Sequence, residues 1–247
     1  KNTGSNDAID SDVNGDMISK VNVTKTDNIN LSSGENDMRW DAGITPIAID
    51  LNGDGIHTIA RADMQGSFDL LGTGKAIQSG WLSKSDGFLA IDSNGNGSID
   101  SVSELFGGTG KGSGFAKLAG YDSNADGVVN ASDAQFASLL IWQDANSNGK
   151  TDAGELVSLK DAGVASLKVA FTELPFLDAN QNLHLERSSV TMSNGKVADM
   201  TDVYFNVAAA DAAAAGVTAP SIAELMGEGA QQMHQIQLVG QCEPAFV

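Results

Sequence analysis

The sequence contains four copies of one short acidic loop, Asp-x-Asn-x-(Asp or Asn)-Gly, and they begin at Asp50, Asp92, Asp122 and Asp144. Side-chain oxygens at positions 1, 3 and 5 of such a loop converge on one point. Glycine at position 6 permits the sharp turn that aims the carbonyl of position 7 at the same point. Ca²⁺ prefers oxygen ligands, so the repeated motif predicts calcium binding rather than four ordinary turns.

A carboxylate at position 12 would complete each site by binding the ion with both oxygens. The third loop has Asp133 at position 12 and the fourth has Glu155, so both are full twelve-residue loops. The second loop carries its acid, Glu104, one position late, where an adjusted exit turn would bring it into reach. The first loop has Arg61 at position 12, so its closing ligand must come from elsewhere, and Asp86 is one candidate.

The predicted calcium ligands are the residues at the oxygen-donating positions of the four loops, with the backbone carbonyl serving at position 7. They are Asp50, Asn52 and Asp54; Asp92, Asn94, Asn96, Ser98, Asp100 and Glu104; Asp122, Asn124, Asp126, Val128 and Asp133; and Asp144, Asn146, Asn148, Lys150 and Glu155. Two imperfect copies, at 10–15 and 69–74, are interpreted as linker and turn.

The charge balance limits the possible partners. The chain has 32 acidic and 14 basic residues and a net charge of -18, which disfavours nucleic acid and anionic membranes and favours cations or basic surfaces. The longest apolar stretch, 207–217, is too short and too interrupted to span a bilayer. We therefore expect no nucleic-acid partner and no membrane span.

Other site chemistries lack their residues. The single cysteine, Cys242, excludes a disulfide within the chain and a cysteine-based zinc site. His57, His184 and His234 lie far apart in the sequence and are interpreted as surface or loop histidines. No Gly-x-Ser-x-Gly motif and no phosphate-binding glycine loop occurs. We assign no catalytic residue.

The chain divides into three segments by composition. Residues 1–40 are polar and are interpreted as a linker or the end of a preceding repeat. Residues 41–206 form the predicted calcium-binding module. Residues 207–247 are alanine-rich and predicted to be helical.

Within the module, apolar patterns predict strands at 44–50, 88–91 and 164–171 and a hairpin around the Asn-Gly pair at 194–195. Helices are predicted at 131–142 and 153–162, after the third and fourth loops. The predicted fold class is therefore α+β: short strands and hairpins packed with an EF-hand-like pair of calcium loops and short helices.

Several segments also occur together in a specific order. They are Thr45–Ile56, the Ser-Gly-Trp-Leu of residues 79–82, Asp86–Asp100, the Ser-Glu-Leu-Phe-Gly of residues 103–107, Ile141–Gly149, and the Gly-Glu-Leu of residues 154–156. Together they resemble the calcium-dependent self-processing module of FrpC-type RTX proteins, over about residues 44–206. The resemblance implies type I secretion into calcium-rich extracellular surroundings and folding on Ca²⁺ through the four loops.

Active members of that family cleave an Asp-Pro bond at the N-terminal edge of the module. The Asp side chain attacks its own carbonyl, and the Asp-Pro bond breaks with the proline nitrogen as the leaving group. Water or a lysine amine then opens the resulting anhydride. The matching pair here is Thr45-Pro46, and no Asp-Pro occurs anywhere in the chain. Because a hydroxyl cannot form that anhydride, we expect a calcium-folded, non-cleaving module of a large adhesin or toxin.

Two alternatives remain open from the sequence. The first is a calcium-triggered autoproteolytic or transpeptidase module whose scissile bond lies outside this sequence. The second is a dockerin-like binding module, because the third and fourth loops begin 22 residues apart and each precedes a predicted helix. The expected partners are calcium ions, together with another protein or a cell surface reached through the parent protein.

Overall fold

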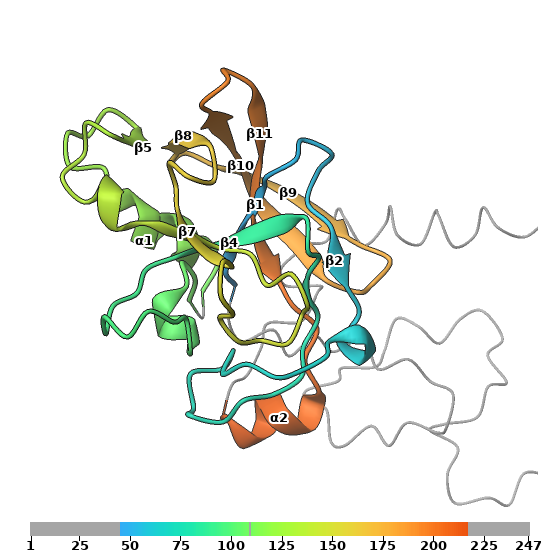
Figure 1. The fold of residues 1–247 in the computed structure, drawn as a ribbon. Helices are drawn as coiled ribbons and strands as arrows, with labels where there is room; N and C mark the ends of the chain where they lie inside the picture. The colour runs from blue at the N-terminus through green and yellow to red at the C-terminus, as the bar shows by residue number, and fades with distance from the viewer. Residues whose placement is uncertain (1–44, 109, 217–247) are drawn as a thin grey trace, which may run out of the picture. The chain divides into compact units, whose positions relative to one another are not determined.

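A computed structural model describes residues 45–108 and 110–216 (Figure 1). The segment 1–40, residues 217–247 of the C-terminal segment, His234 and Cys242 lie outside the described residues. The main feature is a nine-stranded sheet, in which every neighbouring pair is antiparallel. Its strands are β1 (Ile47–Asp50), β4 (Asp86–Ala90), β5 (Val128–Asn130), β6 (Leu140–Trp142), β7 (Leu156–Ser158), β8 (Val164–Lys168), β9 (Thr172–Leu177), β10 (Leu183–Met192) and β11 (Val197–Tyr204).

The strands follow the order β5-β8-β10-β11-β1-β4-β6-β7, and β9 pairs with β10 beside this path. A separate two-stranded sheet joins β2 (Thr58–Ile59) to β3 (Trp81–Leu82). The main sheet curls (Figure 1). Its edge strands are β5, which lies within the third acidic loop, and β7, which follows the fourth. The sheet therefore fixes the positions of the loops that concern function.

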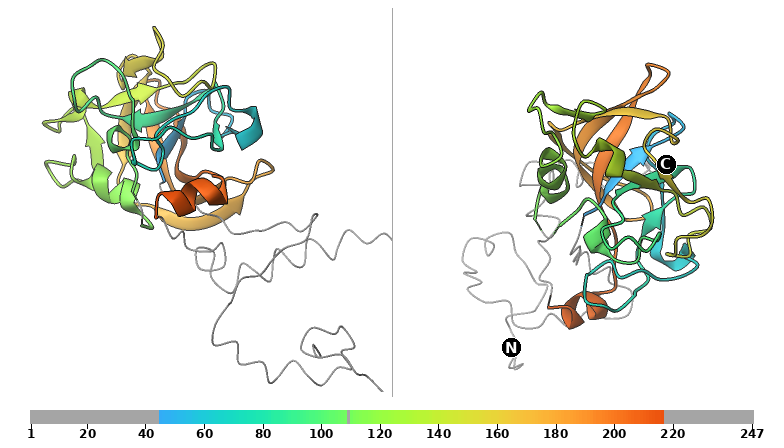
Figure 2. Two further views of the ribbon diagram at one scale, coloured as in Figure 1. Left: turned by 90° about the horizontal axis from the view of Figure 1, so that it is seen from below. Right: turned by 60° about the vertical axis from the view of Figure 1, so that its left-hand side comes forward.

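Helices are few and short in the described residues. They are α1 (Ser113–Ala119), α2 (Ala209–Ala214) and three 3₁₀ turns at Arg61–Asp63, Val102–Glu104 and Phe136–Ser138. Both α-helices lie outside the curled sheet (Figure 2). None of them is long and apolar enough to cross a membrane. The α+β prediction with an EF-hand-like pair is therefore wrong, and the module is mostly antiparallel β.

The error lies in the residues that follow the third and fourth loops. The segment 131–142, predicted as one helix, forms a 3₁₀ turn and then strand β6. The segment 153–162, also predicted as a helix, contains strand β7, which pairs with β6. Short apolar runs such as Leu140–Trp142 suit a buried strand as well as a helix, and here pairing with β4 decides.

The central strands are buried on both faces. Ile47, Ile49 and Leu89 belong to one hydrophobic cluster, whereas Ala48 and Phe88 belong to another. Successive side chains of a strand point to opposite faces of the sheet, so β1 and β4 contribute alternately to two cores. This double burial explains why both strands appear in the sequence as uninterrupted apolar runs, and their prediction as strands is confirmed.

One core is built around aromatic rings. Trp81 lies 4.7 Å from Phe88 and 5.7 Å from Trp142, measured between ring centroids. Phe68 and Phe205 extend the same cluster. Their contacts bring β3, β4 and β6 together with the residue that directly follows β11. This aromatic cluster contacts the fourth loop through Trp81.

The predicted hairpin is also confirmed. Strands β10 and β11 pair in antiparallel register on either side of the turn that contains Asn194 and Gly195. Gly195 has φ +83°, a left-handed conformation that glycine adopts without strain. The Asn-Gly pair was therefore a dependable signal.

Candidate metal centres

The four loops share one turn geometry at their first ligand position. In each loop one carboxylate oxygen of the first Asp accepts a hydrogen bond from the amide of the position-6 glycine. These bonds join Asp50 to Gly55, Asp92 to Gly97 and Asp122 to Gly127 at 2.9 Å, and Asp144 to Gly149 at 2.7 Å. All four glycines have φ between +70° and +95°. The prediction that glycine at position 6 forms a sharp turn is therefore confirmed, and the ligand role of the position-7 carbonyl stays a prediction.

Positions 3 and 5 repeat as well. The side-chain oxygen of each position-3 asparagine accepts the amide of position 5, at 2.9–3.0 Å in all four loops. In the second, third and fourth loops the position-5 oxygen accepts the amide of position 7. The side chains thus fold back over their own loop and gather oxygens close together.

The closing acids of the third and fourth loops hold both ends of the loop. Asp133 accepts the amide of Ser123 at 2.7 Å through Oδ1 and the amide of Asn130 at 2.9 Å through Oδ2. Glu155 accepts the amides of Ala145 and Asp152 at 2.9 Å each. In both loops these donors are positions 2 and 9, so the acid at position 12 faces the loop from its exit.

The second loop reaches the same arrangement with its acid one position later. Glu104 accepts the amide of Ser93 at 3.0 Å and the amide of Asp100 at 3.1 Å, again positions 2 and 9. The 3₁₀ turn Val102–Glu104 carries the extra residue and buries the glutamate, which is 1% exposed. Glu104 therefore takes the place that Ser103 occupies by simple counting.

The first loop is closed by a different strand. Asp50 and Asp86 are direct partners in the register of β1 and β4. A carboxylate oxygen from each of Asp50, Asp54 and Asp86 lies within 4.8 Å of the others. The structure thus brings the sequence candidate Asp86 to the loop, whereas Arg61 lies in the 3₁₀ turn Arg61–Asp63.

Asp86 has one oxygen to spare. Its Oδ2 accepts the amide of His57 at 2.9 Å and the hydroxyl of Ser83 at 3.0 Å, but its buried Oδ1 has no partner. Burial raises the pKa of Asp86, and the nearby Asp50 carboxylate raises it further. A buried carboxylate oxygen without a donor is costly, and a cation would supply what is missing.

Replacing Asp86 with Asn is expected to have opposite effects with and without calcium. In saturating Ca²⁺ the variant should bind one ion fewer by calorimetry and unfold at lower urea. In chelator it should retain at least as much circular-dichroism signal as the wild-type chain, because the repulsion with Asp50 is gone. Asp63→Asn, at an exposed aspartate, is the control. Full ion binding by Asp86→Asn would contradict the site.

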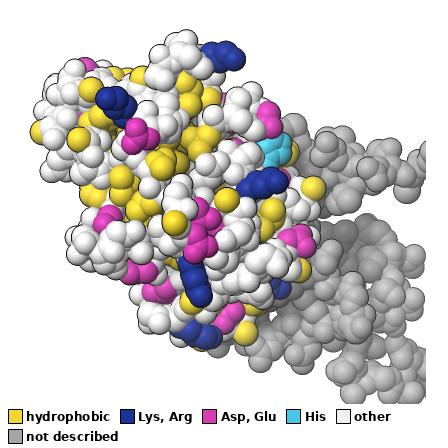
Figure 3. Space-filling model, in the orientation of Figure 1, with side chains coloured by type: hydrophobic (Ala, Val, Ile, Leu, Met, Phe, Trp, Pro, Cys, Tyr) yellow, Lys and Arg dark blue, Asp and Glu magenta, His cyan; other side chains and the backbone are white. Residues whose placement is uncertain are grey.

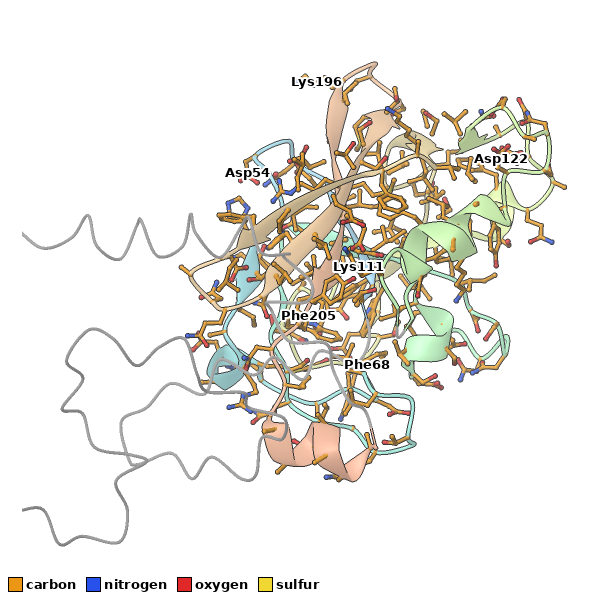
Figure 4. All side chains as sticks on the ribbon, turned by 180° about the vertical axis from the view of Figure 1, so that it is seen from behind. Asp54, Phe68, Lys111, Asp122, Lys196 and Phe205 are labelled. Atoms are coloured by element: carbon orange, nitrogen blue, oxygen red, sulfur yellow. The ribbon has the colours of Figure 1, made fainter. Side chains whose placement is uncertain are left out.

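The second and fourth loops pair with each other. The amide of Ile99 donates to the Thr151 hydroxyl at 2.8 Å, and both residues occupy position 8 of their loops. The sequence had instead suggested a pair formed by the third and fourth loops. The third loop adjoins β5, at the far edge of the sheet from β7, which follows the fourth loop. In Figure 4, Asp54 and Asp122 mark how far apart the first and third loops lie.

The fourth loop is anchored to the aromatic cluster. The Trp81 indole donates to Asp144 Oδ2 at 2.8 Å, the same oxygen that accepts the amide of Gly149. A Cβ atom on Gly149 would lie 2.5 Å from the carbonyl oxygen of Ser67, so only glycine fits this close approach. The position of this loop is thus fixed by the core.

Each site combines three carboxylates with amide and carbonyl oxygens, a donor set that suits Ca²⁺. Asp152, at position 9 of the fourth loop, is not among the ligands predicted from the sequence. Its carboxylate accepts the side-chain amides of Asn146 and Asn148 at 2.8 and 2.9 Å. These hydrogen bonds lower the pKa of Asp152, and the amide of Asn130 lowers the pKa of Asp133. Acidic side chains occupy several separate places on the face in Figure 3.

The two described histidines lie near the first loop but differ in burial. His57 is exposed, and its Nδ1 lies 3.3 Å from Asp54 Oδ1. His184 is 2% exposed, and its Nε2 lies 3.1 Å from Asp178 Oδ2. The interpretation of His184 as a surface or loop residue is therefore wrong, since it sits in the buried part of β10.

The chain is similar to a known protein family and to a known bacterial protein. The family model described as the SPM domain matches residues 47–206. The chain is also 42% identical over 166 residues to the iron-regulated protein FrpA of Neisseria meningitidis serogroup C, and the match covers 64% of this chain and 15% of that relative. The chain thus spans a small part of the relative's length, and the expected relation to FrpC-type proteins is confirmed. The chain belongs to the SPM domain family.

Proposed function

We propose that this chain is a calcium-binding module that folds on Ca²⁺, within a larger secreted protein of the RTX type. One observation carries the proposal: three separate loops close with a carboxylate that accepts the amides of positions 2 and 9. Ordinary turns need no closing acid, so its repetition in three loops favours metal binding. In the second loop the acid, Glu104, keeps this role although it comes one position later. The match to FrpA supports the secreted context.

Calcium would couple to folding through charge. Each site gathers three carboxylates, and several of them, including Asp50, Asp86 and Glu104, are at most 2% exposed. Without a cation these groups repel each other and are poorly solvated, so binding energy becomes folding energy. At millimolar extracellular calcium even loops with dissociation constants near ~10⁻⁴ M are filled. In a calcium-poor cytosol the same loops would be empty, which keeps the chain suited to export.

We further propose that the module does not cleave itself. Thr45 is buried, its amide donates to the carbonyl of Gly108 at 3.3 Å, and the Pro46 carbonyl accepts the amide of Val203 at 3.1 Å. The residues on both sides of the peptide bond between 45 and 46 are therefore fixed by backbone hydrogen bonds to the rest of the module. Its residue 45 lacks the carboxylate that the anhydride chemistry of active relatives needs.

Mass spectrometry tests both parts of the proposal. Native spectra of the wild-type chain in calcium should show two to four bound ions and no change of covalent mass. Thr45→Asp installs an Asp-Pro bond and should yield fragments ending at residue 45 and beginning at Pro46, whereas Thr45→Asn should stay intact. Cleavage of the wild-type chain, or the absence of bound calcium, would contradict the proposal.

The dockerin-like alternative loses its support. It depended on a helix after the third loop and another after the fourth. In the part of the chain that the structure describes, those positions hold strands β6 and β7. No surface for a helix-pair partner is formed there.

A further inference from the structure

A buried acidic pair lies away from the four loops, where β10, β11 and α1 meet. Glu186 and Asp202 are both 0% exposed. The register of β10 against β11 shifts between the pairs His184–Val203 and Arg187–Thr201, and Glu186 and Asp202 lie within this irregularity. The pair is therefore built by the central hairpin, and neither acid belongs to one of the four loops.

The cluster leaves four oxygens without hydrogen-bond partners. They are both carboxylate oxygens of Asp202, Oε2 of Glu186 and the hydroxyl of Thr45. The other oxygen of Glu186 accepts the amide of Gly112 at 2.8 Å and the hydroxyl of Tyr204 at 3.2 Å. Two ionised carboxylates in such a place would be strongly destabilising, so something must neutralise at least one of them.

A cation fits this place poorly. The ammonium group of Lys111, just before α1, is engaged by Glu173 at the surface, 2.7 Å away (Lys111 is labelled in Figure 4). The amide of Gly112 points into the cluster as a donor, and Asp202 Oδ1 lies against Gly114, where a Cβ atom would be 2.3 Å away. A metal ion would face a donor and tight packing, whereas a proton needs no room and turns one oxygen into a donor.

We propose that Glu186 and Asp202 form a buried proton-binding site that holds one shared proton in neutral solution. Glu186 Oε2 and the Thr45 hydroxyl are unpartnered in the same cluster and can accept a hydrogen bond from a protonated Asp202. The site is independent of the calcium ligands. It ties the point where the preceding chain enters β1 to the central hairpin.

The charged surroundings act in the same direction. Burial raises the pKa of Asp202 well above its usual range, and the charge of Glu186 raises it further. The Gly114 amide and the Thr45 hydroxyl face the carboxylate without completing a hydrogen bond, and their opposite effect on this pKa is the smaller one. Burial raises the pKa of Glu186, and Glu173 on β9 adds repulsion. Tyr204 faces the pair from β11, and its pKa is raised by burial and by both acids. Among the basic groups nearby in the sequence, Lys111, just before α1, pairs with Glu173, and Arg187, which follows Glu186, packs over the Phe176 ring.

The sign of the pH effect follows from these directions. Both acids have higher pKa values in the folded chain than in the unfolded chain, where about 4 is ordinary. Their contribution to stability is therefore complete at acidic pH and is lost as pH rises through the folded values. One shared proton makes the unfolding equilibrium constant rise by up to about tenfold per pH unit over that range.

The test compares urea unfolding of the wild-type chain, Asp202→Asn and Asp199→Asn between pH 5.5 and 9, at fixed saturating calcium. Asp199 lies on the same strand but is exposed, so it is the matched control. The ratio of the unfolding constants of the wild-type chain and Asp202→Asn should increase with pH, by up to about tenfold per unit. Asp199→Asn should follow the wild-type chain. A ratio that stays constant with pH would overturn the proposal.

Infrared spectroscopy decides the matter even if Asp202→Asn fails to fold. The calcium-loaded wild-type chain at neutral pH should show the carbonyl stretch of a protonated carboxyl group. Glu186→Gln should shift or remove that band, whereas Asp199→Asn, at the exposed aspartate on β11, should keep it. Absence of the band in the wild-type chain would overturn the proposal.

Discussion

Glu155→Gln should weaken calcium binding at the fourth loop by roughly tenfold to a hundredfold, because it removes the carboxylate that closes the site. Glutamine keeps the volume of the side chain but offers one oxygen instead of two. It also leaves the amide of Ala145 or that of Asp152 without an acceptor. A hundredfold loss of affinity corresponds to about 2.8 kcal/mol, a large share of the stability of a small domain. Isothermal calorimetry and urea unfolding in calcium measure the two effects.

Glu173→Gln is the matched control for this prediction. Glu173 is an exposed glutamate on β9 that pairs with Lys111 at the surface, and such pairs contribute at most about 1 kcal/mol. The control should bind the same number of ions as the wild-type chain. In chelator Glu155→Gln should retain at least as much circular-dichroism signal as the wild-type chain, because one of the repelling carboxylates is gone. If Glu155→Gln kept wild-type affinity at every site, the fourth loop would not be a calcium site.

Trp81→Phe should destabilise the module by more than Trp142→Phe and should also weaken the fourth loop. Both tryptophans are 0% exposed in one aromatic cluster, so the loss of packing is similar, on the order of 1–3 kcal/mol. The Trp81 indole donates to Asp144, whereas the buried indole N–H of Trp142 has no partner. A hydrogen bond to a charged group adds about 1.5–3 kcal/mol.

Comparing Trp81→Phe with Trp142→Phe separates the loss of packing in the aromatic cluster from the loss of the hydrogen bond to Asp144. Urea unfolding in saturating calcium gives the difference in stability, and calorimetry gives the affinity of the weakened site. Trp142→Phe should leave calcium affinity unchanged, because its ring touches no ligand through a hydrogen bond. Equal calcium affinities in the two variants would mean that the aromatic cluster does not position Asp144.

The sequence was most informative about the loops. Glycine at position 6 and asparagine at position 3 act within a few residues of each other, so their geometry follows from local rules. The late acid Glu104 was also foreseen, because a single extra residue can be absorbed by a turn. The strands around Ile49 and Phe88 were recognised because burial on both faces makes them continuously apolar.

The predictions that were wrong concern features set by contacts between residues far apart in the sequence. The residues Leu140–Trp142 have a pattern compatible with a helix, and only the neighbouring β4 makes them a strand. The contact of the second loop with the fourth, through Ile99 and Thr151, joins residues 52 positions apart. The acidic pair Glu186 and Asp202 could not be distinguished among 32 acids, because its burial is a property of the whole sheet.

The central claim, that calcium folds this module, is tested most directly by titrating Ca²⁺ into the chelator-treated chain. Far- and near-ultraviolet circular dichroism would be followed while calorimetry counts the bound ions. We predict a large cooperative gain of β signal and aromatic signal, saturating with two to four ions. A chain that shows the same spectra in chelator and in calcium, with no heat of binding, would contradict the account.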